Sequence, residues 1–172
     1  CLNEGDWQAV EHDLNLRPVE GVNGQNTHEE ILTELARFGI TPEAVTLWGT
    51  GTPLREFLWS EDMADASVHV LLNVDFKDTF DPANPEVRNC HINVGTGLEL
   101  TIRELAEKVV GEIGFRGELR WDASKPDGTP RKLIDVSKLH RLGWHHKVDI
   151  DEGIHKLYEW YKLGICINHQ TV

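Results

Sequence analysis

The sequence has few cysteines and no long apolar run. Its three cysteines contain no Cys-x-x-Cys pair and leave at least one thiol unpaired, which does not fit a disulfide-built secreted module. This cysteine usage favours a reducing compartment, and we expect a cytoplasmic protein. No stretch approaches the roughly 18 apolar residues of a membrane span, and no basic segment followed by an apolar one opens the chain. Because the first residue is Cys1 and not Met, we expect a fragment or a processed product.

Positive charge is also scarce. The chain carries 17 Lys and Arg against 29 Asp and Glu, a formal net charge of -12. It lacks the general positive field that recruits nucleic acid or anionic membranes, so neither is expected as a partner. Basic residues stand beside glycine and proline in two segments, Trp48–Phe57 and Ser124–Lys132. Since Gly and Pro fix turns and an Arg fork matches phosphate oxygens, these segments predict a local site where distant residues converge on one diphosphate.

Hydrophobic periodicity predicts a small mixed α/β domain, with helices packed on a few short strands. Thr27 with Glu30, and Thr101 with Glu104, have the spacing of helix capping boxes. The predicted helices span residues 7–14, 27–38, 60–72, 101–113, 135–142 and 151–163. The predicted strands span residues 45–48, 90–94 and 118–121. For its length of 172 residues, one domain with a real core is expected.

The chain divides into three parts in this interpretation. Residues 1–44 are polar and broken by Pro and Gly, which predicts an irregular, partly helical arm. Residues 45–165 hold the predicted strands, turns and helices and form the binding domain. Residues 166–172 are expected to be a frayed tail, with fraying starting near Gly164.

Several motifs follow one another in an order that is typical of one family. They are Trp48–Gly51, Arg55–Phe57, Asp62–Ala64, Asn93–Gly97, Ile102–Ala106, Asp122–Lys132 and Leu142–Trp144. In order, spacing and length they resemble the GDP-L-fucose synthase family of the extended short-chain dehydrogenases. The resemblance covers residues 45–162 and corresponds to the carboxy-terminal, substrate-binding half of that family. Residues 1–44 do not match its common pattern and are interpreted as a lineage-specific insertion.

The resemblance implies an enzyme that epimerises carbons 3 and 5 of GDP-4-keto-6-deoxymannose and then reduces carbon 4 with NADPH. The family's glycine-rich dinucleotide loop, its Ser/Tyr/Lys hydride machinery and its Cys and His epimerisation residues all lie upstream of the matching region. The Rossmann half is therefore expected to be absent, and with it the catalytic residues and the NADP(H) site. No cofactor is expected on this chain, which should be inactive alone, and the full-length enzyme is expected to be a homodimer.

Four residues are candidate contacts to the GDP-sugar. By resemblance, Trp48 and Arg55 lie against the GDP part, where a guanidinium pairs with diphosphate oxygens and an indole packs on a base or sugar face. Lys125 would add a point charge near the phosphates. Asp127 resembles the family acid that accepts hydrogen bonds from sugar or ribose hydroxyls. Arg131 and Lys132 are weaker candidates.

Each candidate also has a structural alternative. Trp48 has the position of a core anchor at a strand end. Arg55 has Glu56 and Glu61 near it in sequence as partners for a surface salt bridge. The loop that holds Lys125 and Asp127 contains Pro-Asp-Gly, a common turn sequence.

Other patterns carry no site in this interpretation. Tyr158 and Lys162 reproduce the Tyr-x-x-x-Lys spacing of short-chain dehydrogenases, but their place in the last helix favours core packing. The Gly-x-Gly turns at 49–51 and 95–97 lack the third glycine of a dinucleotide fingerprint. No two of the nine histidines share a helical face with acidic support, so a metal site is not expected. Cys90 is interpreted as a small buried hydrophobe within a strand.

Two rival functions remain open. One is the substrate domain of another nucleotide-sugar epimerase or dehydratase, since Arg-Glu-Phe and Asn-Val-Gly themes recur there. The Lys125–Lys132 run favours the fucose enzyme. The other is a non-catalytic interaction module that uses residues 1–44 to bind a partner.

Overall fold

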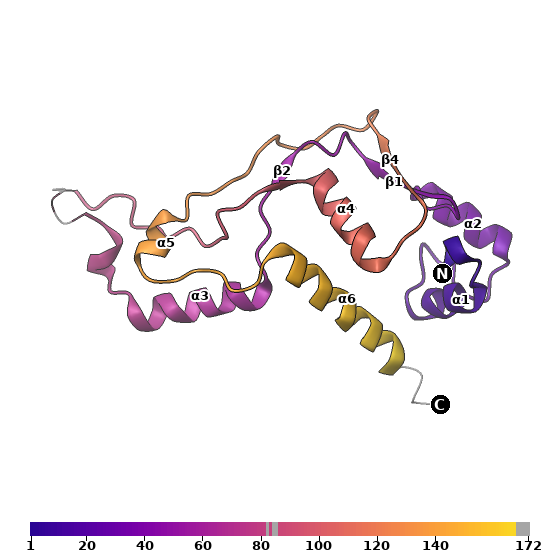
Figure 1. Ribbon diagram of the computed structural model, residues 1–172, viewed down its shortest axis with the longest axis horizontal. Coiled ribbons are helices and arrows are strands. Elements are labelled where there is room, and N and C mark those ends of the chain that lie inside the picture. Colours follow the sequence, from indigo (N-terminus) through magenta and orange to yellow (C-terminus); the bar gives the residue numbers. More distant parts are fainter. Residues whose placement is uncertain (82, 84–85, 168–172) are drawn as a thin grey trace.

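The computed structural model describes residues 1–81, 83 and 86–167. The molecule is elongated, with the amino-terminal helices at one end, α3 and α5 at the other, and α4 and α6 between them (Figure 1). The helices are α1 (Trp7–Leu16), α2 (His28–Arg37), α3 (Ser60–Asn73), α4 (Ile102–Ile113), α5 (Ser137–Arg141) and α6 (Ile150–Ile167). Two short 3-10 helices, η1 (Leu2–Glu4) and η2 (Phe76–Thr79), complete the helical elements of the described residues.

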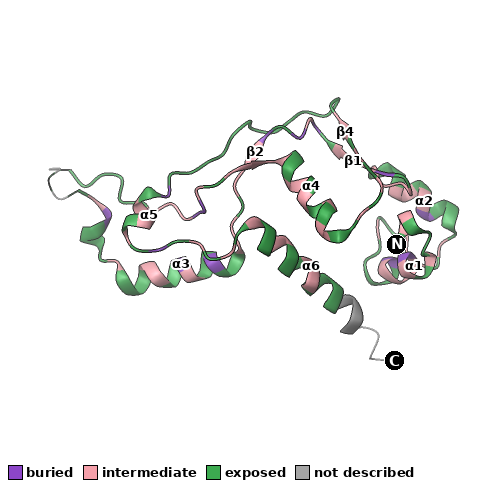
Figure 2. Cartoon of the chain, viewed as in Figure 1, coloured by how far each residue is buried: buried purple, intermediate pink, exposed green. Residues whose placement is uncertain are grey.

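The amino-terminal arm has a small core of its own. Val10, Leu14 and Ile31 from α1 and α2 are buried together. The Asp6 side chain accepts the Ala9 N–H at the start of α1. Thr27 forms the predicted capping box at the start of α2. The arm is therefore two packed helices, with more order than its polar, Gly/Pro-broken sequence predicts (Figure 2).

Two pairs of short strands organise the centre of the molecule. Strand β1 (Ala44–Trp48) pairs in parallel with β4 (Glu118–Asp122), with Trp48 opposite Asp122. The two-residue strands β2 (Leu54–Arg55) and β3 (Leu100–Thr101) pair antiparallel. Because parallel strands end at the same edge of a sheet, the chain leaves β1 and β4 side by side. This pairing brings the two basic segments together.

A second buried cluster lies at the other end of the molecule. Ala66 of α3, Leu139 of α5 and Trp144 pack there, with exposed fractions of 0 to 3%. Asp62 is buried beside them, and its carboxylate accepts the backbone N–H groups of Lys147 and Val148 at 2.9 Å each. Figure 2 shows that purple, buried residues are few and lie in separate places along the chain. The described residues thus form two small buried clusters and not the single core that the sequence predicts.

The predicted strand over residues 90–94 is wrong. This segment is irregular and pairs with no strand among the described residues. Its backbone is held by side chains instead: the Lys138 ammonium donates to the carbonyls of Asn89 and His91. Ile92 and Val94 pack against the second cluster, so their alternation reflects contact with a core and not a ladder. Cys90 is exposed, which corrects its prediction as a buried residue within a strand.

Several boundaries also differ from expectation. Trp59, not Ser60, is the N-cap residue of α3, with no side-chain capping bond. The Asp135 carboxylate accepts the Ser137 N–H, while Val136 is the N-cap residue of α5. Helix α6 continues through residues 166 and 167, which the sequence assigned to a frayed tail, and residues 168–172 of that tail lie outside the described residues.

In the part of the chain that the structure describes, no helix has the length and apolar character needed to cross a membrane.

Candidate functional site

The turn after β1 and the loop after β4 meet through Thr50 and Asp127. The Thr50 N–H donates to Asp127 Oδ1 at 2.8 Å, and the Thr50 hydroxyl donates to Asp127 Oδ2 at 2.6 Å. Gly49 fits beside them because its φ is +80° and because a Cβ there would lie 2.3 Å from Asp127 Oδ1. The predicted convergence of two distant segments is therefore present in the structure.

The opposite side of the same turn is held by Arg103. Its Nη2 donates to the Thr50 carbonyl at 2.7 Å, and its guanidinium carbon lies 4.5 Å from the centre of the Trp121 ring. Trp121 also packs under the turn, since a Cβ on Gly51 would lie 2.6 Å from the indole. In the sequence, Arg103 stood out only as part of the motif Ile102–Ala106. Its place in the first turn of a capped helix gave no indication that its side chain reaches residue 50.

Arg55 lies half-buried against the second segment. Its Nη1 donates to the carbonyls of Leu54 and Thr129, both at 2.7 Å. Its Nη2 is 3.1 Å from where a Cβ on Gly128 would stand. The salt-bridge alternative is wrong, because Arg55 pairs with no carboxylate among the described residues.

Trp48 and Lys125 form the exposed side of this junction. Trp48 is 76% exposed, so it is not the core anchor that its strand-end position allowed. The Lys125 ammonium lies 5.7 Å from the centre of the Trp48 ring. Within the described ranges Lys125 has no ion pair, which leaves an ammonium and an aromatic face together at the surface.

Asp127 is a fixed anion within the junction. The Thr50 hydroxyl and then the Thr50 N–H hold the pKa of its carboxyl below the ordinary value. Asp127 is therefore ionised at neutral pH. Both of its oxygens already accept a hydrogen bond from Thr50, and each keeps a second lone pair for a further donor. We define the junction as Trp48, Thr50, Arg55, Lys125 and Asp127.

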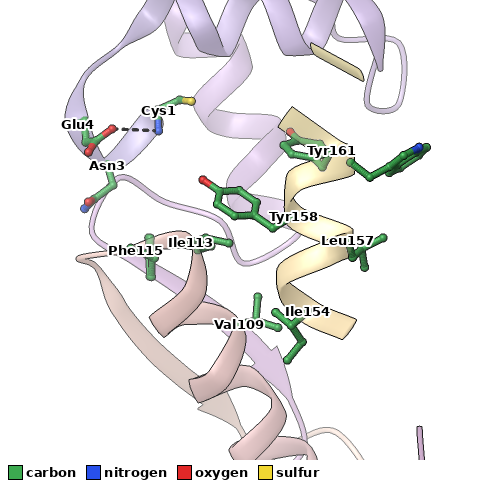
Figure 3. Close-up of a pocket in the computed structure, with 12 residues that line it drawn as sticks. Cys1, Asn3, Glu4, Val109, Ile113, Phe115, Ile154, Leu157, Tyr158 and Tyr161 are labelled. Carbon is green, nitrogen blue, oxygen red and sulfur yellow. Dashed lines mark ion pairs between the residues drawn. The ribbon is translucent and has the colours of Figure 1, made fainter. Parts of the chain in front are cut away.

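The Tyr158 and Lys162 pair lies far along the molecule, on α6. The Lys162 ammonium sits 4.7 Å from the centre of the Tyr158 ring and pairs with Glu159. Tyr158 lines an open, mainly apolar groove of about 640 Å³ between α4, α6 and the first residues of the chain (Figure 3). Its lining includes Val109, Ile113, Phe115, Ile154, Leu157, Trp160 and Tyr161. Tyr158 belongs to neither buried cluster and Lys162 is exposed, so the core packing predicted for this pair is wrong.

Two of the histidines, His140 and His145, stack on each other. The rings of His140 and His145 lie 4.1 Å apart, and His140 Nε2 has no hydrogen-bond partner. Burial, and then the neighbouring His145 and His146, lower the pKa of His140. Among the described residues no three His, Cys, Asp or Glu side chains gather as metal ligands.

Comparison with known proteins places these features in a family. The NAD dependent epimerase/dehydratase family profile matches residues 14–95. GDP-L-fucose synthase of Escherichia coli is 48% identical over 117 residues, covering 68% of this chain and 36% of that protein. Probable GDP-L-fucose synthase 1 of Oryza sativa is 49% identical over 149 residues, covering 84% of this chain and 41% of that protein.

Solved structures show the same likeness. The crystal structure of a GDP-6-OMe-4-keto-L-xylo-heptose reductase from C. jejuni matches with a TM-score of 0.82 and 40% identity, covering 95% of this chain and 44% of that one. UDP-glucose 4-epimerase from Thermotoga maritima shares the fold with a TM-score of 0.57 at 22% identity and 72% coverage of this chain, 36% of that one.

Two facts about extent follow from these matches. The chain spans about 36 to 41% of the length of the two synthases. Because the family profile begins at residue 14, the expectation that residues 1–44 lie outside the family's pattern is wrong from that residue onward. The chain therefore matches the NAD dependent epimerase/dehydratase family over residues 14–95 and resembles the GDP-L-fucose synthases.

Proposed function

We propose that this chain is the GDP-sugar-binding part of an NADPH-dependent epimerase and reductase that forms GDP-L-fucose from GDP-4-keto-6-deoxymannose. The single observation that carries the proposal is that the loop after β4 contacts both Trp48, through the Lys125 ammonium, and Arg55, through the Thr129 carbonyl. The similarity to proteins named GDP-L-fucose synthase supports the choice of nucleotide and sugar. The rest of such an enzyme would supply the catalytic residues, and this chain alone would be inactive.

Each junction residue has a proposed task in binding. The Arg55 fork and the Lys125 ammonium neutralise the two phosphates, and the exposed face of Trp48 packs on the guanine or ribose. Asp127 accepts a ribose or sugar hydroxyl with the lone pairs that Thr50 leaves unused. The Asp127 carboxylate also offsets part of the basic charge, so the site binds one diphosphate and not an extended polyanion.

NADP(H) does not fit the glycine turns of the described residues. A dinucleotide loop needs open glycine backbone against a pyrophosphate. Here Gly51 faces the Trp121 ring, and a Cβ on Gly95 would lie 2.3 Å from Glu56 Oε1, so neither turn leaves that space. We therefore propose that the cofactor binds another part of the enzyme, the amino-terminal Rossmann half.

We also propose that the full-length enzyme is a homodimer in the cytoplasm.

Calorimetric titration of the chain with GDP and with NADPH tests this proposal. We expect weak GDP binding and no NADPH binding. NADPH binding as tight as GDP binding would contradict the proposal. UDP and dTDP serve as matched diphosphates, and equal affinity for all three would favour a different nucleotide-sugar enzyme.

A second candidate is a GDP-heptose reductase. The solved C. jejuni structures with 39 to 40% identity carry heptose names, among them a GDP-D-glycero-L-gluco-heptose synthase. Because GDP is common to both candidates, GDP binding does not separate them. Turnover of GDP-4-keto-6-deoxymannose against a GDP-4-keto-heptose by the longer enzyme does so, and preference for the heptose would select the second candidate.

A further inference from the structure

Glu56 follows Arg55 but engages a different part of the chain. Its Oε1 accepts the backbone N–H groups of Thr96 at 2.5 Å and Gly97 at 2.7 Å, and the Thr96 hydroxyl at 3.2 Å. Its Oε2 lies 3.5 Å from the Ile134 N–H. Successive N–H groups aimed at one anion form a backbone nest, here occupied by a side chain of the same protein.

The turn that holds Glu56 is shaped around the carboxylate. A Cβ on Gly95 would lie 2.3 Å from Oε1, and Gly97 has a φ of +74°, which favours glycine. Thr96 is only 8% exposed, so its N–H and hydroxyl have little access to water. Loss of the carboxylate would leave these donors unpaired, which is costly at a buried position.

Arg55 and Glu56 are adjacent in the chain but contact different segments. Side chains of successive residues in extended chain point to opposite sides. The bonds from Glu56 to the turn at 95–97 fix the orientation of the backbone at residues 55 and 56. Because Arg55 points to the other side of this backbone, its guanidinium is directed toward the carbonyl of Thr129. Three segments distant in sequence, 54–57, 95–97 and 129–134, are joined through these two side chains.

We propose that Glu56 is a positioning residue for diphosphate binding: it touches no ligand and fixes the place of the Arg55 guanidinium. This role rests on the proposed function, because it needs Arg55 to bind phosphate. If Glu56 has only a structural role, its substitution affects folding and leaves the preference for a diphosphate unchanged. If Glu56 is a positioning residue, its substitution lowers the affinity for GDP and leaves the weaker binding of guanosine, which has no phosphate, as it was.

Two variants disturb the contact from opposite sides. Glu56→Gln removes the charge and turns an amide NH₂ toward backbone donors. Gly95→Ala keeps the charge and pushes the carboxylate away through its Cβ. Glu107→Gln is the matched control, since Glu107 is an exposed carboxylate on α4 that loses the same charge.

The experiment combines calorimetry with GDP and guanosine and amide hydrogen exchange at residues 96 and 97. We expect both variants to exchange faster at these amides and to bind GDP roughly tenfold more weakly, with guanosine and the Glu107→Gln control unchanged. Faster exchange with full GDP affinity in either folded variant would overturn the positioning role. Should Glu56→Gln not fold, Gly95→Ala decides alone, and Glu56→Asp, with its carboxylate retained, is expected to restore part of the affinity.

Failure of the proposed function has a different signature. A wild-type chain that binds no GDP, with slow exchange at residues 96 and 97, overturns diphosphate binding and with it the positioning role, while the Glu56 contact itself stands. A wild-type chain that binds GDP and exchanges these amides rapidly overturns the positioning role only.

Discussion

Two regions of the molecule each expose a tryptophan, and the side chains and turns around the two rings differ. Trp48 at the junction is 76% exposed, and Trp160 on α6 is 69% exposed. Trp48 stands beside an ammonium group and a turn tied down by Asp127 and Arg103. Trp160 lines an apolar groove with Leu157 and Tyr161.

This difference supports the proposed ligand site at the junction. Exposure of a large side chain is common here and identifies nothing by itself. At the junction, the hydrogen bonds of the turn join residues 53 and 77 positions apart, and the Lys125 ammonium lies beside the exposed Trp48 ring. In the groove, the lining is mainly apolar and offers few groups that would orient a charged ligand. The junction thus has the charged groups that the proposed anion binding requires, and the groove has mainly apolar ones.

Removal of the Arg55 guanidinium is expected to have the largest effect on GDP binding at the junction. Arg55→Ala is expected to weaken GDP binding by about ten- to a hundredfold, because charge-assisted hydrogen bonds contribute roughly 1.5–3 kcal/mol. Calorimetric titration measures the loss. Arg116→Ala is the control, since Arg116 is exposed and makes no ion pair among the described residues. Equal affinity in the Arg55→Ala chain and the wild type would contradict the account.

The two tryptophans can be exchanged for alanine as a matched pair. Both variants are expected to keep the free energy of unfolding within about 0.5 kcal/mol of wild type, because both side chains are largely exposed. Only Trp48→Ala should weaken GDP binding, by about 1 kcal/mol or more for a lost stacking contact. Urea denaturation and GDP titration of the same samples check both statements. A loss of GDP affinity in Trp160→Ala alone would reverse the comparison.

Arg103 tests the turn and not the ligand contacts. Arg103→Ala removes the bond to the Thr50 carbonyl and the contact with Trp121, so the free energy of unfolding should fall by about 1 kcal/mol. GDP affinity should fall severalfold, less than in Arg55→Ala. Arg103→Lys keeps the charge but not the planar fork, and is expected to recover only part of either loss. Full GDP affinity in Arg103→Ala would show that the turn keeps its shape without this side chain.

His140 gives the smallest expected effect, on stability and outside both regions. Burial and the neighbouring histidines lower its pKa in the folded chain, so the unfolded chain takes up the proton first as pH falls. Stability from this residue is present above the unfolded pKa of about 6.5 and decreases as pH falls through it. Urea denaturation at about pH 7.5 and about pH 5.5 should show a smaller decrease in His140→Leu than in wild type. An equal decrease in both would contradict the assignment.

Local patterns in the sequence predicted the elements that local contacts stabilise. The capping boxes at Thr27 and Thr101 were predicted from residue spacing alone and are present. Strands β1 and β4 were predicted, but nothing in either segment says that they pair with each other. The two-residue strands β2 and β3 are too short to leave a periodic pattern, and residues 90–94 have a strand-like pattern that a core contact explains instead.

For the candidate site, too, the sequence predicted the segments involved but not the contacts between distant residues. The convergence of Trp48, Arg55, Lys125 and Asp127 was predicted from turns and charge, together with the resemblance, and the structure brings these segments together. Their contacts to a ligand stay predictions. The roles of Glu56 and Arg103 could not be predicted, because each depends on a backbone group 40 or more positions away.

Nitrogen-15 NMR of the arginine side chains gives the most direct measurement, with the Arg55 Nε–H resonance assigned by its loss in Arg55→Lys. On addition of GDP this resonance should shift strongly, with GMP it should shift less, and with guanosine it should stay in place. GDP binding that shifts other resonances and leaves the Arg55 resonance in place would contradict the account. Its central claim is that the segments Trp48–Phe57 and Ser124–Lys132 form one diphosphate site.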